Sequence, residues 1–452
     1  MKLTRRRALV GVSVVLLSAL AAAGVYLARV APIVVAYKAK MLCSEVFVGG
    51  REPRAVLADL EADDLAPLRY IATSIDSATQ SVTATGLSVV TRRAVHQNGR
   101  GCTISFGADV PRELQTPSGH DSSRTIDESP EDAELLLDAP PNPALEGVID
   151  RAFAEPDPQR LRRTRAIVVV HKGHVVAERY ATGFTATTPV LGWSMAKSVM
   201  NALVGILVKN GRLSLDRPLA IPEWQGAGDP RREITLDHLL RMSSGLRFDE
   251  GMTSPLTDVT YMLLDTGDAS GFAMAKALDV APGVRWQYSS GTTNIIARVL
   301  RNVFNDDRAY YAFPRRALFD RLGMTNAVIE TDAAGTFIGS SFMYATARDW
   351  ARLGILYLQD GIWHGERILP EGWVAYSRSP TSQSAGRYGA HFWVEGDMFQ
   401  AAGHEGQFVT IVPSRDTVIV RLGLTRYGDA WDHPGFVRDV LGSLGDSTHS
   451  SN

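Results

Sequence analysis

The stretch that decides the fold spans residues 193–211 and reads WSMAKSVMNALVGILVKNG. Apolar residues recur at helical spacing from position 194 to 208, and Asn210-Gly211 is a typical helix end. Ser194 and Lys197 stand three positions apart at the start of this helix, so their side chains share a face. A helix N-terminus favours developing negative charge, and burial lets a lysine lose its proton. We therefore expect Ser194 to be a nucleophile and Lys197 its activating base.

A second motif, Tyr288-Ser289-Ser290, follows Trp286 and precedes an expected helix. A tyrosine close to cations can carry a proton between a nucleophile and a leaving group. The alternative is a tyrosine that only packs at a loop-to-helix junction. Read together with the Ser194–Lys197 pair, the motif predicts Tyr288 as a proton shuttle.

A third motif, Gly403-His404-Glu405-Gly406-Gln407, leads into an apolar run at residues 408–412. His404 offers a positive or donor group, and Gly406 leaves room for a substrate beside a strand edge. The amide of Gln407 is expected to form an oxyanion hole with that of Ser194. Large aromatic residues often line small-molecule clefts, although each could equally be core. On that basis the candidate pocket residues are Trp193, Tyr344 and Trp393.

Strand patterns lie at both ends of this region and helical patterns lie between them. Two β-branched runs at residues 165–170 and 174–180 are split by Lys172-Gly173 and predict a hairpin, as do residues 408–412 and 417–422 near the C-terminus. Helices are expected at residues 234–242, 261–264, 294–304, 311–322, 347–358 and 434–444. The order predicts an α+β fold (an α/β sandwich), with one antiparallel sheet built from distant segments, flanking helices and a helical lobe.

The order Ser-x-x-Lys, Tyr-x-x and basic-x-Gly resembles the serine β-lactamase and penicillin-binding superfamily. The likeness extends over residues 145–445 and is greatest to the class C-like branch, especially the nylon-oligomer (6-aminohexanoate-dimer) hydrolases and related esterases. It implies a β-lactamase/transpeptidase-like fold, with Ser194 acylated, Lys197 as activator and Tyr288 as proton shuttle. Ser290 stands where class C enzymes carry Asn, and His404-Glu405-Gly406 replaces Lys-Thr-Gly. These departures favour small amides or esters over β-lactams as substrates.

The motifs are also compatible with other functions. A cell-wall D-amino-acid peptidase and a β-lactamase are enzymatic alternatives, and a non-catalytic binding module is disfavoured because Ser194, Lys197 and Tyr288 are all present. A metal site is not expected, because His404-Glu405 lacks the second histidine of a His-Glu-x-x-His motif. No cofactor is predicted. With 47 basic and 49 acidic residues, the chain lacks the positive charge that nucleic-acid binding needs. The oligomeric state stays open.

The N-terminus predicts export and membrane attachment. Lys2 and Arg5-Arg6-Arg7 precede an uncharged run at residues 8–28 that is long enough to cross a bilayer. Positive-inside logic places the following body outside the cytoplasm, in the periplasm or at the cell surface. We expect residues 1–37 to be an uncleaved anchor. The alternatives are a signal cleaved near residues 19–23 and a buried core helix.

The remaining chain divides by composition. Residues 38–110 form an expected strand-rich unit, residues 111–144 are rich in Pro, Ser, Asp and Glu and predict a linker, and residues 145–446 form the hydrolase domain. Cys43 and Cys102 are the two cysteines of the sequence. In an exported protein such a pair most simply forms one disulfide.

Overall fold

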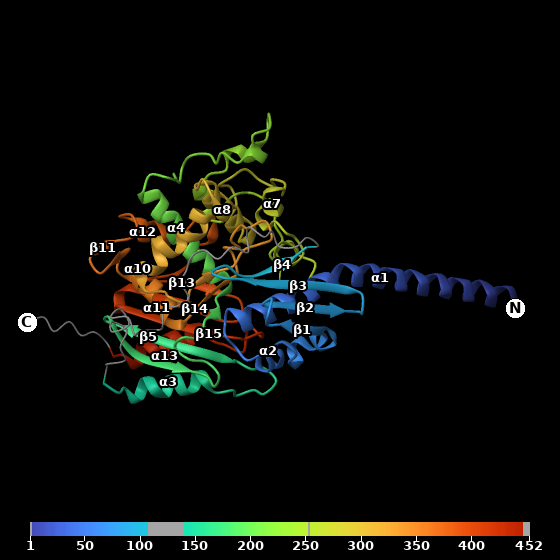
Figure 1. The fold of residues 1–452 in the computed structure, drawn as a ribbon, viewed down its shortest axis with the longest axis horizontal. Helices are drawn as coiled ribbons and strands as arrows, with labels where there is room; N and C mark the ends of the chain where they lie inside the picture. The colour runs from blue at the N-terminus through green and yellow to red at the C-terminus, as the bar shows by residue number, and fades with distance from the viewer. Residues whose placement is uncertain (1, 107–139, 252–253, 446–452) are drawn as a thin grey trace, which may run out of the picture.

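A six-stranded antiparallel sheet forms the centre of the protein. The computed structural model describes residues 2–106, 140–251 and 254–445 (Figure 1). The strand order is β12-β13-β14-β15-β5-β6, and β5 pairs with β15 through register partners such as Val168 and Val420. The expected mixture of helices with an antiparallel sheet from distant segments is therefore confirmed. The strands are β5 (Thr164–His171), β6 (His174–Tyr180), β12 (Trp393–Glu395), β13 (Met398–Gly403), β14 (Gln407–Val412) and β15 (Thr417–Gly423).

Helices cover both faces of this sheet. Along β5 the side chains alternate, so that Ile167 and Val169 pack with α3 (Pro143–Phe153) and α13 (His433–Ser443) in one apolar cluster. Val168 and Val170 belong to the larger cluster on the other side. That cluster includes α11 (Ala347–Leu358) and α4 (Ala196–Lys209). The helix α4, which begins two residues after Ser194, is thus central, and its side chains from Ala196 to Leu207 are buried.

A helical lobe and a small sheet complete the hydrolase domain. The lobe contains α5 (Leu236–Leu240), α6 (Asp258–Leu264), α7 (Ala269–Met274), α8 (Ser290–Asn302) and α9 (Asp307–Pro314). The expected helix at residues 311–322 is interrupted after Pro314 by a π-helical turn and ends in α10 (Asp320–Leu322). A three-stranded sheet has the order β7-β9-β8. The β10–β11 hairpin (Ile362–Trp363, Glu366–Arg367) and α12 (Trp373–Arg378) follow α11 along the chain. The small sheet consists of β7 (Val190–Leu191), β8 (Val328–Ile329) and β9 (Met343–Ala345).

The strand-rich segment before residue 107 is an antiparallel meander packed on a long helix. The helix α1 (Lys2–Phe47) is continuous, and its side chains from Ile33 to Ser44 are mostly buried against the meander. We call α1 from Ile33 onward, α2 (Pro53–Leu60), η1 (Asp63–Tyr70) and this meander the N-terminal unit. Its first two strands, at residues 72–76 and 81–86, are joined by a turn. The meander consists of β1 (Ala72–Asp76), β2 (Ser81–Gly86), β3 (Val90–Gln97) and β4 (Gly101–Ser105).

Two expected boundaries differ from the structure. The boundary at residue 37 falls inside α1, because the apolar residues around it pack against protein. Residues 107–139, most of the expected linker, lie outside the described residues, and Pro143 already begins α3.

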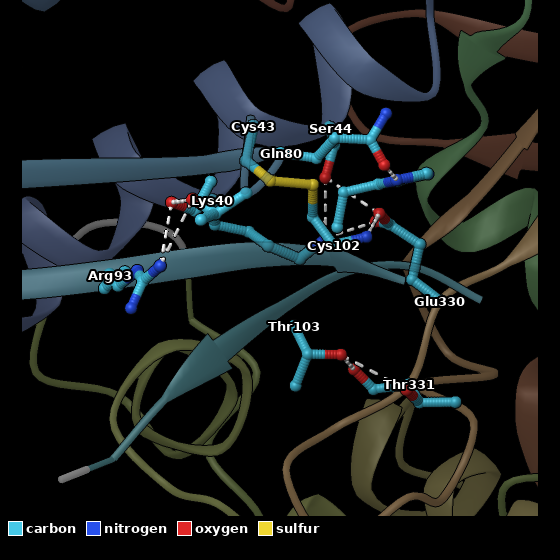
Figure 2. The surroundings of a disulfide bond; sticks show 12 residues. Lys40, Cys43, Ser44, Gln80, Arg93, Cys102, Thr103, Glu330 and Thr331 are labelled. Carbon is cyan, nitrogen blue, oxygen red and sulfur yellow. Dashed lines mark hydrogen bonds and ion pairs between the residues drawn. A yellow bond between two sulfur atoms is a disulfide. The ribbon is translucent and has the colours of Figure 1, made fainter. Parts of the chain in front are cut away.

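The N-terminal unit is fastened to the hydrolase domain beside a disulfide (Figure 2). Cys43 of α1 is bonded to Cys102 of β4, as predicted. Glu330, which follows β8, is buried and accepts hydrogen bonds from the Ser44 hydroxyl at 2.8 Å and the Cys102 amide at 2.6 Å. Its carboxylate also forms an ion pair with Lys40. Burial lowers the pKa of Lys40, and the charge of Glu330 acts in the opposite direction.

The first part of α1 projects away from the body (Figure 1). Side chains from residue 11 to 29 are exposed, and α1 is long and apolar enough to cross a membrane. Because these side chains are exposed, the alternative of a buried core helix is wrong.

Candidate active site

Ser194 lies in a tight turn between a strand and the central helix. The chain leaves β7, passes Gly192, forms the 3₁₀ turn η4 (Trp193–Met195) and enters α4. Trp193 has a φ of 48°, a left-handed conformation that costs energy for a bulky residue. A Cβ on Gly192 would lie 2.4 Å from Cζ2 of Trp350, so this position requires glycine. The turn leaves Ser194 half-buried at the start of the helix.

Lys197 is the hub of the site. Its Nζ donates to Ser194 Oγ, to Ser290 Oγ and to the Ser340 carbonyl oxygen, each at 3.0 Å. The side chain is 1% exposed, and burial lowers the pKa of Lys197 to about 8, while the charge of Glu250 acts in the opposite direction. The three hydrogens of an ammonium are thus all bonded, and a neutral amine would have its lone pair available to the Ser194 hydroxyl.

Tyr288 lies beside both members of this pair. It shares a hydrogen bond with Ser194, and Lys197 Nζ is 4.9 Å from the centre of its ring. Burial raises the pKa of Tyr288, the charge of Glu250 raises it further, and the bond with Ser194 lowers it. The phenol is therefore neutral and able to donate a proton. Trp393 stacks on Tyr288 with ring centres 5.5 Å apart, which places this predicted aromatic residue at the site.

A carboxylate that the sequence motifs do not include completes the polar network. Glu250 accepts hydrogen bonds from the Ser290 amide at 2.7 Å and from the Ser290 hydroxyl. Ser290 is the first residue of α8, with Ser289 as its N-cap. Glu250 acts on Lys197 and Tyr288 through its charge. It lies in a loop without a recognisable motif, so only the three-dimensional contacts identify it.

The third sequence motif forms the turn between β13 and β14. A Cβ on Gly403 would lie 2.2 Å from the Gly192 carbonyl oxygen, so the end of β13 touches the turn that carries Ser194. His404 is exposed, with its ring 5.5 Å from that of Trp193. The neighbouring Glu405 accepts a hydrogen bond from Trp193 Nε1 at 3.0 Å. The strand beside the turn that carries Ser194 is thus β13, which sequence patterns did not predict.

Gly406 has a role other than the one expected. It has a φ of 81°, and a Cβ there would lie 2.1 Å from Arg421 Nη1. Its carbonyl accepts from the same atom at 2.7 Å. Glycine is needed here for packing on Arg421, and room for substrate beside Gly406 stays a prediction.

Gln407 and Tyr344 are held by other parts of the fold. The buried Gln407 side chain donates to the Gly423 carbonyl at 2.6 Å and accepts from the Gly423 amide at 3.0 Å. The role of its own amide in an oxyanion hole stays a prediction. Tyr344 is fully buried on β9 and donates to Glu45 of α1 at 3.1 Å. It is a core residue, and its assignment to the pocket is wrong.

A buried histidine braces the first turn of α4. His391 Nδ1 is 2.9 Å from the Lys197 carbonyl oxygen, and its own carbonyl accepts from Ser198 Oγ at 2.7 Å. Burial lowers the pKa of His391 to about 3, so the ring is neutral. The loop therefore fixes the backbone that carries Ser194 and Lys197. Within the described ranges, no cluster of three or more His, Cys, Asp or Glu side chains is placed to hold a metal ion.

The comparisons with known proteins agree with this geometry. The beta-lactamase family model matches residues 149–438, which include Ser194, Lys197 and Tyr288. The chain belongs to the beta-lactamase family. A 6-aminohexanoate-dimer hydrolase from Paenarthrobacter ureafaciens is 26% identical over 294 residues, 58% of this chain and 74% of that protein. The beta-lactamase-family match and this relative together support a hydrolase.

Solved structures show the same beta-lactamase-family fold. A putative 6-aminohexanoate-dimer hydrolase from Bacillus anthracis superposes with a TM-score of 0.55 at 23% identity, covering 66% of this chain and 82% of its own. A penicillin-binding protein from Bacillus halodurans gives a TM-score of 0.51 at 16% identity, covering 66% and 98%. The N-terminal unit lies before the residues that match the family.

Proposed function

We propose that this protein is a serine hydrolase that cleaves small amide or ester bonds through a covalent acyl intermediate on Ser194. The observation that carries the proposal is the hydrogen bond of 3.0 Å between Lys197 Nζ and Ser194 Oγ. It is supported by the burial that lowers the pKa of Lys197 to about 8.

In acylation, neutral Lys197 takes the proton of Ser194 while Oγ forms a bond to the substrate carbonyl carbon. Tyr288 donates its proton to the leaving nitrogen or oxygen as the bond to the carbonyl carbon breaks. The phenolate then recovers a proton from Lys197. In deacylation a water loses a proton to the same groups as its oxygen bonds to the acyl carbon. The bond between that carbon and Ser194 Oγ then breaks, the proton returns to Oγ, and the acid leaves.

The substrate class rests on two observations. The relative from Paenarthrobacter ureafaciens is named for hydrolysis of 6-aminohexanoate dimer, and His404 replaces the lysine of the Lys-Thr-Gly motif. We therefore propose small amides and esters as substrates and low activity on β-lactams.

We also propose that the exposed part of α1 crosses a membrane and that the body lies outside the cytoplasm. The basic start of the chain, the exposed apolar side chains and the Cys43–Cys102 disulfide support this placement.

The test uses the full chain in detergent with short-acyl p-nitrophenyl esters, a small amide panel and a chromogenic cephalosporin. Ser194→Ala and Lys197→Ala should each lose about 10³-fold or more in kcat/KM, because the first removes the proposed nucleophile and the second removes its base. Lys209→Ala, an exposed lysine on the same helix, should match the parent.

A serine-directed fluorophosphonate should label the parent and leave Ser194→Ala unlabelled. Labelling that persists in Ser194→Ala would overturn the assignment of the nucleophile. A folded parent that is inert to every substrate and to the probe would favour a binding module.

A further inference from the structure

Three large apolar side chains are exposed on the N-terminal unit. Tyr70 is 83% exposed, and Leu87 and Val89, in the turn between β2 and β3, are 61% and 81% exposed. Turns usually carry Gly, Pro, Asn, Asp or Ser. Large apolar residues gathered on an exposed turn are unusual, and such a group marks a candidate interaction site.

The packing of Gly86 shows where this turn lies along α1. A Cβ on Gly86 would be 2.7 Å from Val35 Cγ2 and 3.6 Å from Ile71 Cγ1. The end of β2 therefore lies at the level of Val35, together with Ile71 and its neighbour Tyr70. The Cys43–Cys102 disulfide marks the opposite end of the meander, farther along α1.

The turn therefore points toward the exposed end of α1. Figure 1 shows β2 and β3 alongside the place where α1 leaves the body. Residues 8–28 of α1 span about 32 Å, close to the ~30 Å of a bilayer's hydrocarbon core.

The positions of these residues along the α1 axis place the turn at the membrane surface. Val35 is about 10 Å beyond residue 28 along the helix axis. The turn extends roughly 5–7 Å from Gly86 back toward the bilayer, which brings Leu87 and Val89 into the layer of lipid headgroups. Tyr26 and Arg29 of α1 are exposed near the same level and are residue types that favour membrane interfaces.

Tyr70 is held in place by a buried cation. Lys38 Nζ donates to the carbonyl oxygens of Leu68 at 2.8 Å and Ile71 at 2.7 Å, on either side of Tyr70, and forms an ion pair with Glu61. Burying an ammonium is costly unless its hydrogens are bonded. The fold thus fixes the backbone around Tyr70 to α1 while the ring itself stays exposed.

We propose that Tyr70, Leu87 and Val89 form a membrane-facing tip that inserts into the interfacial layer of the leaflet from which α1 emerges. The partner is the lipid bilayer. The tip is a second attachment that fixes the orientation of the hydrolase domain, and it rests on the proposed membrane span of α1.

The experiment places an environment-sensitive fluorophore at single added cysteines in the full chain, reconstituted in phosphatidylcholine nanodiscs with the native disulfide intact. Leu87→Cys and Val89→Cys report on the tip, and Leu17→Cys reports on the span. Val284→Cys is the matched control, because Val284 is 60% exposed on a loop of the helical lobe. Nitroxide lipids labelled at the headgroup or deep in the acyl chain act as quenchers.

We expect the deep nitroxide to quench the label at position 17, the headgroup nitroxide to quench the labels at 87 and 89, and neither to quench the label at 284. If the label at position 17 is quenched but the labels at 87 and 89 behave like the label at 284, the proposed tip is wrong and the proposed anchor stands. Absence of quenching at 17 would overturn the anchor and the tip together. Shielding of 87 from aqueous iodide without lipid quenching would indicate a protein partner and also overturn the proposal.

A second variant separates insertion from folding. Leu87→Asp/Val89→Asp places two charges at the tip, and a label at Tyr70→Cys should then lose its headgroup quenching toward the level of position 284. Ester hydrolysis by this variant should match the parent, which shows that the body is folded. Unchanged quenching at position 70 would contradict the proposal.

Discussion

The ammonium of Lys197 has three hydrogens and three acceptors, one from each of three separate segments of the chain. This arrangement holds Nζ at one point beside Ser194 Oγ in either protonation state. Burial supplies the second requirement of a base, because it lowers the pKa of Lys197 from 10.5 to about 8. Position and proton affinity are therefore set by different parts of the structure.

The pH dependence of kcat/KM should follow the neutral fraction of Lys197. About 1% of the amine is neutral at pH 6 and about half at pH 8, so ester hydrolysis should rise about tenfold per pH unit below pH 8 and level off above it. Initial rates at low substrate concentration between pH 5.5 and 9.5 measure this. A rate independent of pH over that range would contradict the role of Lys197.

Replacing Glu250 should move this profile. Its negative charge raises the pKa of Lys197, so Glu250→Gln should shift the rising limb to lower pH. The maximal rate should also fall, because Gln has one acceptor oxygen for the two donors of Ser290, its amide and its hydroxyl. Glu250→Asp should restore the position of the limb in part. Glu371→Gln, at an exposed site, should leave the profile unchanged, and an unshifted limb in Glu250→Gln would contradict the electrostatic role.

Residues separated by one helical turn could be predicted from the sequence. Ser194 and Lys197 meet because a helix brings positions three apart together, whatever the rest of the fold does. Glu250 and the Ser340 carbonyl reach the same site from distant loops. No local pattern encodes these contacts, because they depend on how the lobe packs against α4.

At the scale of elements, the turn between β7 and α4 sets the position of Ser194 Oγ. Gly192 fits between Trp350 on one side and Gly403 of β13 on the other. Trp193 is fixed by Glu405, which also forms an ion pair with Arg426. The turn is therefore confined by two elements that are far away in sequence.

Gly192→Ala should lower kcat by about 10²-fold, because a misplacement of about 1 Å has that effect on a positioned nucleophile. The added methyl would lie 2.4 Å from the Trp350 ring, so the turn must move. Gly226→Ala is the matched control, since nothing lies within 4 Å of its Cβ. Stopped-flow acylation and thermal unfolding together measure the effect. Equal kcat in both variants would show that the turn tolerates the shift.

Prediction of whole elements succeeded where the signal was local. Thr235 and His238 form the capping box that begins α5, close to the expected helix start. The strand β13 was missed because its sequence, Met398-Phe399-Gln400-Ala401-Ala402-Gly403, contains no β-branched residue. It is a strand because β12 and β14 lie on either side of it.

At the scale of the molecule, the disulfide and the buried Glu330 join the N-terminal unit to the domain. Cys43→Ser/Cys102→Ser should lower the free energy of unfolding by about 2–4 kcal/mol, because it releases a cross-link between positions 59 residues apart. Chemical denaturation measures the loss. Reducing agent should destabilise the parent to the same extent and leave the double variant unchanged, and equal stability of all samples would contradict a structural role.

The pairing of β5 with β15 has a consequence for the time at which the protein can fold. Residues 164–171 leave the ribosome long before residues 417–423. At a synthesis rate of about 5–20 residues per second, β5 is complete roughly 12–50 s before its pairing strand β15 is made. During this interval the nascent chain displays an open strand edge to other chains. We therefore expect a chain truncated before residue 417, which lacks β15, to aggregate and not to form a smaller hydrolase.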